Sequence, residues 1–158
     1  MSPTESARSE REHRKRQAFI GREQEILSVS ERLMADKGVR KVSVDTIAAR
    51  TGIGKGTIYK HFDSKRGLLI AMAIRHYDML FELLGRSTDP AQALSDWIEA
   101  RLNGARQSML IRELTETLAD DSGALSKIQE SQAQMRKRLA QVLSGSSTTR
   151  GESMERAM

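Results

Sequence analysis

The sequence predicts an all-α protein. Apolar residues recur at helical spacing along most of the chain, and no segment shows the alternation of a half-buried strand. Proline occurs only 2 times and phenylalanine 3 times, while an apolar content of 38% is enough for a packed core. This composition is typical of a helical globular chain rather than of a β-rich or disordered one. A chain of 158 residues can form one domain, or a small module joined to a helical body.

The composition also excludes several kinds of protein. No apolar run approaches the ~20 residues that a membrane span needs, and the first residues lack the apolar core of a secretory signal. The chain has no cysteine, and its 3 histidines, His13, His61 and His76, are far apart in the sequence. A disulfide framework and a thiolate metal site are therefore excluded. We expect no metal, no cofactor, no membrane partner and a cytoplasmic location.

Positive charge is concentrated in the first part of the chain. Residues 1–65 hold 14 Lys and Arg against 9 Asp and Glu, whereas residues 66–158 hold 12 of each kind, so their net charges are +5 and 0. A basic module ahead of a neutral body is typical of a nucleic-acid-binding protein with a separate sensing or pairing part. A solvated surface that is poor in acidic residues explains the charge equally well.

The N-terminal residues predict an arm followed by a first helix. Residues 1–18 are polar and rich in arginine, so we expect a flexible basic arm that becomes helical only near its end. Between Ile26 and Met34, apolar side chains and Ser30 form one helical stripe. Gly38 stands where a C-terminal cap of that helix is expected.

Two short helices are expected next. Ser43 can accept hydrogen bonds from the first amides of a helix that ends at Gly52. The segment from Lys55 to Phe62 predicts another helix, in which Ile58 and Phe62 lie on the same side.

The remaining elements are longer helices and a tail. Residues 68–84 are apolar nearly all round, so we expect this fourth helix to be buried between two parts of the molecule. Asp89 followed by Pro90 marks the start of the next helix, and further helical stretches are predicted over residues 108–119 and 123–143. Apolar periodicity is lost from residue 144 onward, which predicts a disordered tail.

The glycine-rich segment TGIGKGTIYKHF, Thr51 to Phe62, invites a comparison with phosphate-binding loops. A P-loop needs a glycine, four spacers and then Gly-Lys-Ser/Thr, but here Gly56 follows Lys55 and Ala49 stands at the first glycine position. The dinucleotide-binding pattern fails as well, because Thr57 replaces its last glycine and a helix rather than a strand precedes it. A phosphate loop is therefore not expected.

A helix-turn-helix explains the same segment better. This motif requires a tight turn, small residues where two short helices cross, and a polar or basic outward face on the second helix. Gly52 supplies the turn, and Ala48 and Ala49 supply the small contacts. Side chains facing outward can pair with phosphates or reach base edges. The predicted outward residues are Lys55, Thr57, Tyr59, Lys60 and His61.

The segment KVSVDTIAARTGIGKGTIYKHFDSKRGLL resembles the DNA-binding signature of the TetR-type family of bacterial transcriptional regulators, and the resemblance covers residues 20–84. It implies that the third helix enters the major groove of DNA and that neighbouring elements add flanking contacts. The implied contacts at the start of the third helix are Lys55 and Gly56. Those along it are Thr57, Tyr59 and His61, and the flanking contacts are Ser43, Thr46, Arg50 and Lys65.

Several of these residues have a second interpretation. The ring of Tyr59 can pack in the core instead of presenting its hydroxyl. His61 can simply cap the C-terminal end of its helix, where a cation is favourable. Lys65 and Arg66 can be solvated charges, and Arg66 is assigned to that class. The family commonly has serine at the position of Gly54, which is a slightly weaker cap.

The predicted domains are a basic arm (1–18), a helix-turn-helix DNA-binding domain (19–65), a helical regulatory and dimerisation domain (66–143) and the tail (144–158). Family members continue through helices that close a ligand cavity and pair two subunits. Only about three helices follow Leu84 here, so we expect a reduced pocket and dimer interface, or a natural or artificial truncation. Candidate pocket residues, which fit a core equally well, are Leu94, Trp97, Met109, Leu114 and Met135.

The leading hypothesis is a sequence-specific DNA-binding transcriptional regulator, acting as a ligand-responsive repressor. Its expected partners are a pseudo-palindromic operator in double-stranded DNA, a second copy of the chain and a small-molecule effector of unknown identity. The alternative is a protein of the same fold that works through protein–protein interaction without specific DNA binding. An enzyme is not expected, because no paired carboxylates or Ser/His/Asp arrangement has suitable spacing.

Overall fold

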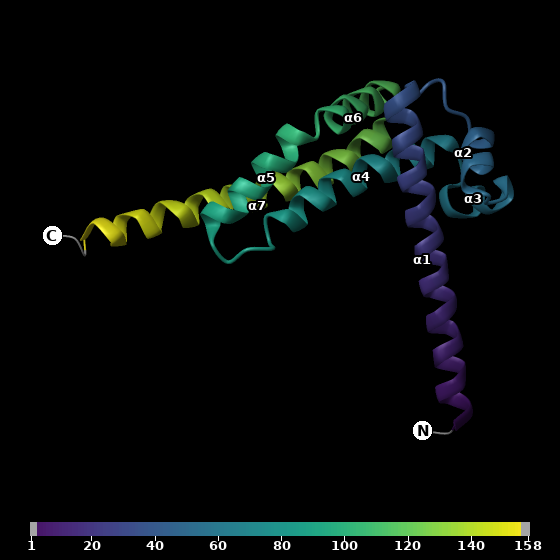
Figure 1. Ribbon diagram of the computed structural model, residues 1–158, viewed down its shortest axis with the longest axis horizontal. Coiled ribbons are helices and arrows are strands. Elements are labelled where there is room, and N and C mark those ends of the chain that lie inside the picture. The colour runs from purple at the N-terminus through teal and green to yellow at the C-terminus, as the bar shows by residue number, and fades with distance from the viewer. Residues whose placement is uncertain (1–2, 156–158) are drawn as a thin grey trace. The chain divides into compact units, whose positions relative to one another are not determined.

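The computed structural model describes residues 3–155, with side chains over residues 8–144 apart from 103 and 105. Over this range the chain forms seven α-helices and no strand, which confirms the predicted all-α fold (Figure 1). The helices are α1 (Pro3–Lys37), α2 (Val44–Thr51), α3 (Lys55–Phe62), α4 (Lys65–Leu83), α5 (Pro90–Asn103), α6 (Ala105–Thr117) and α7 (Ser122–Glu155).

The chain divides into two compact units, Met1–Leu68 and Leu69–Met158, with the boundary inside α4. None of the helices over the described residues is both long and apolar enough to cross a membrane.

The first unit is built around a core shared by α1, α2 and α3. α1 packs against α2, and α2 packs against α3. Ser30 is fully buried, and its hydroxyl donates to the carbonyl oxygen of Ile26 at 2.7 Å. This polar side chain therefore lies in the apolar stripe without an unsatisfied hydrogen-bonding group. The largest contributors to this core are Ile26, Met34, Val39, Ile47, Ile58, Phe62 and Leu68.

Local signals set the ends of the short helices. The Ser43 hydroxyl accepts from the Thr46 amide at 3.1 Å, as the predicted N-cap of α2 requires. Gly52 ends α2 with φ 70°, a left-handed conformation that favours glycine. α3 occupies the predicted Lys55–Phe62 segment.

A tight approach joins α3 to α4. The Ser64 hydroxyl accepts from the Gly67 amide at 3.0 Å and so caps the start of α4. Gly67 lies directly against the end of α3, where a side-chain carbon would collide with the carbonyl oxygen of Phe62. Only glycine fits at this position.

The second unit combines the later part of α4 with α5, α6 and α7. α5 packs against both α6 and α7, and the Gln132 side-chain amide on α7 donates to the Tyr77 hydroxyl on α4 at 2.7 Å. α5 begins as predicted, with Asp89 accepting from the Ala91 amide at 3.0 Å and Pro90 at the first helical position. Fully buried large side chains of this unit are Met72, Leu80, Leu84, Leu114, Leu118 and Ile128.

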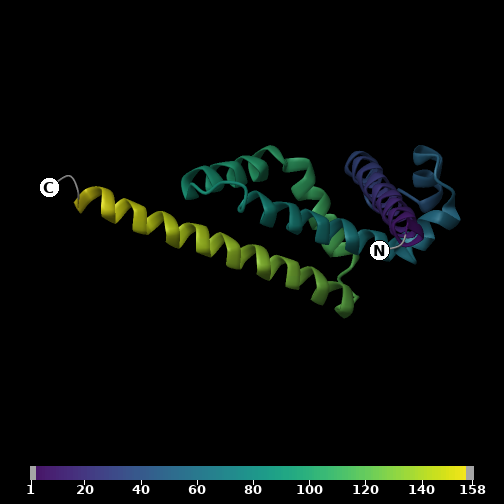
Figure 2. The same cartoon turned by 90° about the horizontal axis from the view of Figure 1, so that it is seen from below.

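The structure differs from the sequence expectation at both ends of the chain. α1 begins at Pro3 rather than after a flexible arm, because residues 4–18 are rich in Arg, Glu and Lys, which favour helix, and contain neither glycine nor a further proline. α7 continues to Glu155 through the segment expected to be disordered (Figure 2). Extending an existing helix adds one hydrogen bond per residue without a new nucleation step, which explains both extensions.

α4 also differs from its prediction. The side chains of Met79 and Phe81 are exposed, so the helix is not covered all round. The buried side of its later half contains Ala73, Tyr77 and Leu80, which is the ordinary stripe of a helix packed on one side.

Candidate nucleic-acid interface

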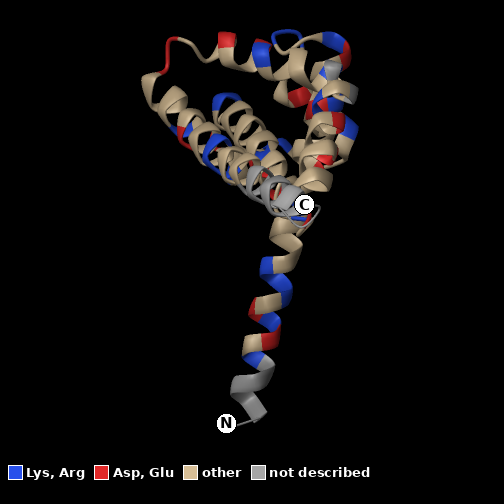
Figure 3. Cartoon of the chain, turned by 90° about the vertical axis from the view of Figure 1, so that its left-hand side faces the viewer, with Lys and Arg blue, Asp and Glu red and all other residues tan. Residues whose placement is uncertain are grey.

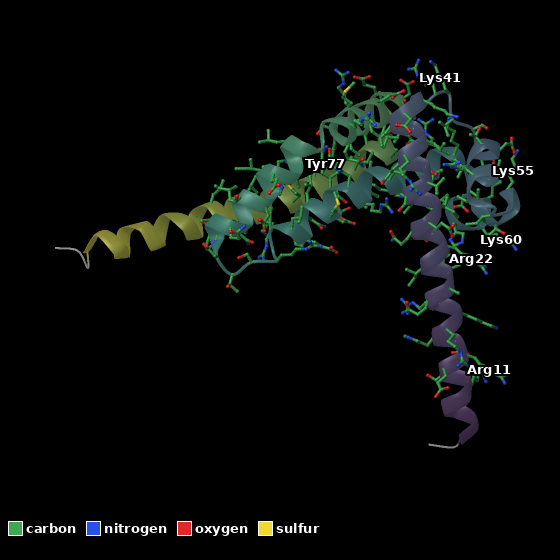
Figure 4. The ribbon with its side chains drawn as sticks, in the orientation of Figure 1. Arg11, Arg22, Lys41, Lys55, Lys60 and Tyr77 are labelled. Carbon is green, nitrogen blue, oxygen red and sulfur yellow. The ribbon has the colours of Figure 1, made fainter. Side chains whose placement is uncertain are left out.

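The candidate interface is formed by α2, the turn at Gly52 and α3. Ile58 and Phe62 are buried and fix α3 to the core, so the opposite side of this helix faces outward. Lys55 and Lys60, labelled in Figure 4, are both exposed on α3. Tyr59 lies between them in the sequence and is 37% exposed, so its ring is not enclosed in the core. The outward face therefore presents two cations and a phenol.

Lys55 is paired with Asp45, which connects the first turn of α3 to the first turn of α2. The Lys55 ammonium lies 2.8 Å from Oδ1 and 3.0 Å from Oδ2 of Asp45. This hydrogen bond and the negative charge of Asp45 raise the pKa of Lys55 above its ordinary value. Both side chains are well exposed to solvent, so an incoming phosphate can compete with the carboxylate for the ammonium.

The start of α3 is open to an approaching molecule. A side-chain carbon built on Gly54 or Gly56 would meet no atom within 4 Å, so internal packing does not require glycine at either position. Gly54 is the N-cap and contributes no side-chain hydrogen bond to α3. A helix start of this kind presents amide donors and the positive end of the helix dipole, both of which attract anions such as phosphate.

Other predicted site residues surround this face. Ser43 is exposed, and its hydroxyl lies 2.9 Å from that of Thr46. Thr57 is half-buried on α3. Arg50, at the end of α2, lines a hollow of about 440 Å³ with Thr46 and with residues of α1. The structure thus places Ser43 and Thr46 near the Asp45–Lys55 contact, and Arg50 at the opposite end of α2.

His61 does not belong to the outward face that the sequence predicted. Its side chain is only 2% exposed, and its ring stacks on Phe19 of α1 with 3.9 Å between ring centres. The nearest carboxylate oxygen, on Glu23, is 3.7 Å from Nδ1, which is beyond hydrogen-bond reach. The sequence did not predict that Phe19 covers His61, because Phe19 was included in no apolar stripe.

Lys65 is committed to a backbone partner. Its ammonium donates to the carbonyl oxygen of Val39 at 3.0 Å, which ties the start of α4 to the segment that follows α1. Burial of the side chain lowers the pKa of Lys65. This hydrogen bond stabilises the start of α4, so Lys65 has a structural role whether or not it also contacts DNA.

A second basic surface lies on the first half of α1. Five exposed cations outnumber the acidic residues there, and Figure 3 shows bands of Lys and Arg along this helix with acidic positions between them. The cations are Arg8, Arg11, Arg14, Lys15 and Arg16. A rigid helical row of charge can track a phosphate backbone without reading sequence.

Comparisons with known proteins match the same module. A family model described as "Bacterial regulatory proteins, tetR family" matches residues 26–72. The HTH-type transcriptional activator FasR of Mycolicibacterium smegmatis is 34% identical over 80 residues, which are 48% of this chain and 36% of that protein. The HTH-type transcriptional repressor KstR2 of Rhodococcus jostii is 38% identical over 61 residues, covering 39% of this chain and 30% of its own length.

A solved structure extends the similarity beyond the module. The ketosteroid transcriptional regulator KstR2 of Mycobacterium tuberculosis aligns with a TM-score of 0.54 and 24% identity, over 78% of this chain and 66% of that one. This similarity concerns the fold. The sequence matches to the curated relatives span about a third of their lengths.

Proposed function

Because the chain belongs to the TetR family of bacterial regulators through its first unit, we propose that it is a sequence-specific DNA-binding transcriptional regulator located in the cytoplasm. The observation that carries this proposal is the solvent-exposed surface of α3, which has an open helix start with Lys55 in its first turn and which exposes Tyr59 and Lys60 further along. Cations of this kind position a helix on phosphates, and the phenol can reach a base edge or a thymine methyl group.

The proposed DNA-contacting residues divide by role. Lys55, Gly56 and Thr57 stand at the entering end of α3, and Tyr59 and Lys60 on its exposed side. Flanking phosphate contacts are assigned to Ser43, Thr46, Arg50 and Lys65. His61 is proposed as a support for α3 through its stack on Phe19 rather than as a direct contact.

We further propose that two copies bind a pseudo-palindromic operator and that a small molecule releases them, so that the protein acts as a repressor. Recognition of a two-fold site requires two reading helices about one helical turn or more apart. Exposed apolar side chains on the second unit supply material for an interface between copies; Leu102 is 74% exposed. The others are Met79, Phe81, Ile98, Met109 and Leu143.

The first experiment is a selection of random duplex DNA by the purified full chain, together with the mass of the bound species by sedimentation. We expect enrichment of a two-fold symmetric sequence bound by a dimer. The Tyr59→Ala variant should lose the enrichment while keeping its melting temperature, and Tyr59→Phe separates the contribution of the hydroxyl from that of the ring. Arg86→Ala removes an exposed cation from the second unit and is the matched control for Lys55→Ala, which removes one from α3.

The alternative of a protein–protein interaction module makes a different prediction in the same experiment. Binding would then be weak, blind to sequence and strongly dependent on salt, because only the phosphate contribution remains. No enrichment by the wild-type chain would reject sequence-specific regulation. Enrichment that survives in Tyr59→Ala and Lys55→Ala would reject α3 as the reading helix.

A further inference from the structure

The second unit contains a cavity with a cationic lining. It has a volume of about 300 Å³, at the lower end of the range for small-molecule sites. The lining comes from α4, α5 and α6 and includes two arginines but no carboxylate. The residues are His76, Tyr77, Arg101, Ser108, Ile111, Arg112 and Thr115.

His76 is the buried polar group of this lining. The residue is 6% exposed, and neither ring nitrogen has a hydrogen-bond partner within the described part of the chain. Burial, with a smaller contribution from the charge of Arg101, lowers the pKa of His76 to about 4. At neutral pH the ring is therefore uncharged, with one N–H to donate and one nitrogen to accept. Buried polar groups normally have partners, so this side chain lacks one that a ligand can supply.

The two arginines can supply the charge for an anionic ligand. The Arg101 guanidinium lies 5.7 Å from the ring centre of Trp97, an arrangement that limits the freedom of this side chain. Arg112 is largely exposed and has only a long contact of 3.8 Å to Glu116, one turn further along α6. A guanidinium presents paired N–H donors that match the two oxygens of a carboxylate.

The rest of the lining favours an anion that carries an organic body. Ile111 and the ring of Tyr77 are buried and apolar. Because the Tyr77 hydroxyl already accepts from Gln132 at 2.7 Å, its orientation is fixed and its own proton remains available to a ligand. Figure 4 shows Tyr77 among the helices of this unit. A free inorganic ion would leave the apolar part of the cavity unused.

We propose that this cavity binds a small organic carboxylate, with Arg101 and Arg112 pairing with the carboxylate, His76 hydrogen-bonding to the ligand, and Ile111 and Tyr77 contacting its apolar body. The inference rests on the proposed function, because it defines the chemical class of the effector. Thr115 contributes less as a donor, since its hydroxyl already donates to the Ile111 carbonyl at 2.8 Å.

Isothermal titration calorimetry on the full chain without DNA tests this site. The probes are benzoate, 2-naphthoate and decanoate, each beside its neutral amide, with inorganic phosphate as the body-free anion. We expect at least one carboxylate to bind at least about tenfold more tightly than its amide, and Arg101→Gln and Arg112→Gln each to lose about tenfold, as expected for a charged hydrogen bond. Arg86→Gln should bind like the wild type.

The contrary outcomes are equally definite. Equal binding of acids and amides, no binding of any carboxylate, or unchanged affinity in Arg101→Gln would overturn the proposal, and so would phosphate binding as tight as that of the best carboxylate. His76→Asn keeps a donor and an acceptor, so it should retain more affinity than His76→Leu if the ring hydrogen-bonds to the ligand. Melting temperatures verify that each variant is folded.

The DNA selection separates this proposal from the function on which it rests. Carboxylate binding without any enriched DNA sequence would reject the regulator and leave the cavity assignment intact. An enriched DNA sequence without carboxylate binding would reject only the cavity assignment.

Discussion

Asp45 holds Lys55 in the absence of DNA, with ammonium–carboxylate distances of 2.8 and 3.0 Å across the start of α2 and α3. A phosphate that binds Lys55 must displace this carboxylate or share the ammonium with it. Under the proposed assignment of Lys55 to a phosphate contact, Asp45 therefore opposes binding to the backbone of any DNA sequence.

Replacing Asp45 by asparagine should strengthen binding to random duplex DNA. The expected gain is about two- to fivefold at low salt, the usual worth of an exposed ion pair, and it should shrink as salt rises. Fluorescence anisotropy with a random duplex across a salt series measures it. Asp96→Asn removes the same charge from a partly exposed position on α5, and an equal gain in that variant would show that net charge, not the pairing with Lys55, is responsible.

Replacing Gly56 by alanine should separate folding from DNA binding. No atom lies within 4 Å of the added carbon, and alanine favours helix over glycine, so the free energy of unfolding should rise by about 0.5–1 kcal/mol. Operator affinity should fall, because the added methyl group occupies space that DNA is proposed to approach. Denaturant unfolding and anisotropy measure the two effects, and unchanged affinity would remove Gly56 from the interface.

Gly52→Ala is the matched comparison for that variant. Space is also open at this position, but its φ of 70° is unfavourable for a side chain. The free energy of unfolding should therefore fall by about 1 kcal/mol. A change in stability of the same sign in Gly52→Ala and Gly56→Ala would contradict this account, in which the positive φ of Gly52 separates the two variants.

Truncating Ile58 to alanine should unfold the first unit more easily. Ile58 is almost completely buried and joins α3 to the core, and a cavity there should lower the free energy of unfolding by about 2–5 kcal/mol. Denaturant unfolding followed by circular dichroism measures the loss. Ile20→Ala, at an exposed position on α1, should cost far less, and similar costs for the two variants would contradict the assignment of Ile58 to the core.

His76 should make the second unit sensitive to acid. Its folded-state pKa of about 4 lies below the ordinary 6.5, so between these values the unfolded chain binds a proton that the folded chain does not. Stability is therefore retained above pH 6.5 and lost as the pH falls toward 4. The charged residues that line the cavity with His76 are Arg101 and Arg112, and the charge of Arg101 opposes protonation of the ring.

The His76→Asn variant tests this pH dependence. Carboxylates also titrate in this range, so the informative quantity is the difference between wild-type and variant melting temperatures from pH 7.5 to 4. We expect the wild type to lose more stability than the variant. Parallel curves would mean that the imidazole binds protons equally in the folded and unfolded states.

The short helices could be predicted from sequence because their signals are local. Ser43 and Gly52 mark the ends of α2 through caps that depend on neighbouring residues, and Asp89 with Pro90 does the same for α5. The predicted lengths of α1 and α7 were too short. A polar segment is expected to be disordered when it stands alone, but it can be helical when it continues a helix that is already packed. Composition alone does not reveal whether such a helix is present.

The candidate site was harder to predict, because its details depend on contacts between residues far apart in the chain. The stack of Phe19 on His61 follows from how α1 lies against α3, and the hydrogen bond from Lys65 to Val39 joins the start of α4 to the segment after α1. Helical spacing places His61 on an outward face, but it does not report that α1 covers that position. The assignment of Lys55, Tyr59 and Lys60 to DNA contact stays a prediction.

The collision that excludes a side chain at Gly67 has a consequence for how the module tolerates sequence change. A library of variants screened only for folded protein should keep glycine at position 67, while positions 54 and 56 accept many residues because the space beside them is empty. The same library screened for operator occupancy should lose that tolerance at 54 and 56. Comparing the two screens would tell apart, glycine by glycine, what the chain requires in order to fold and what it requires in order to read.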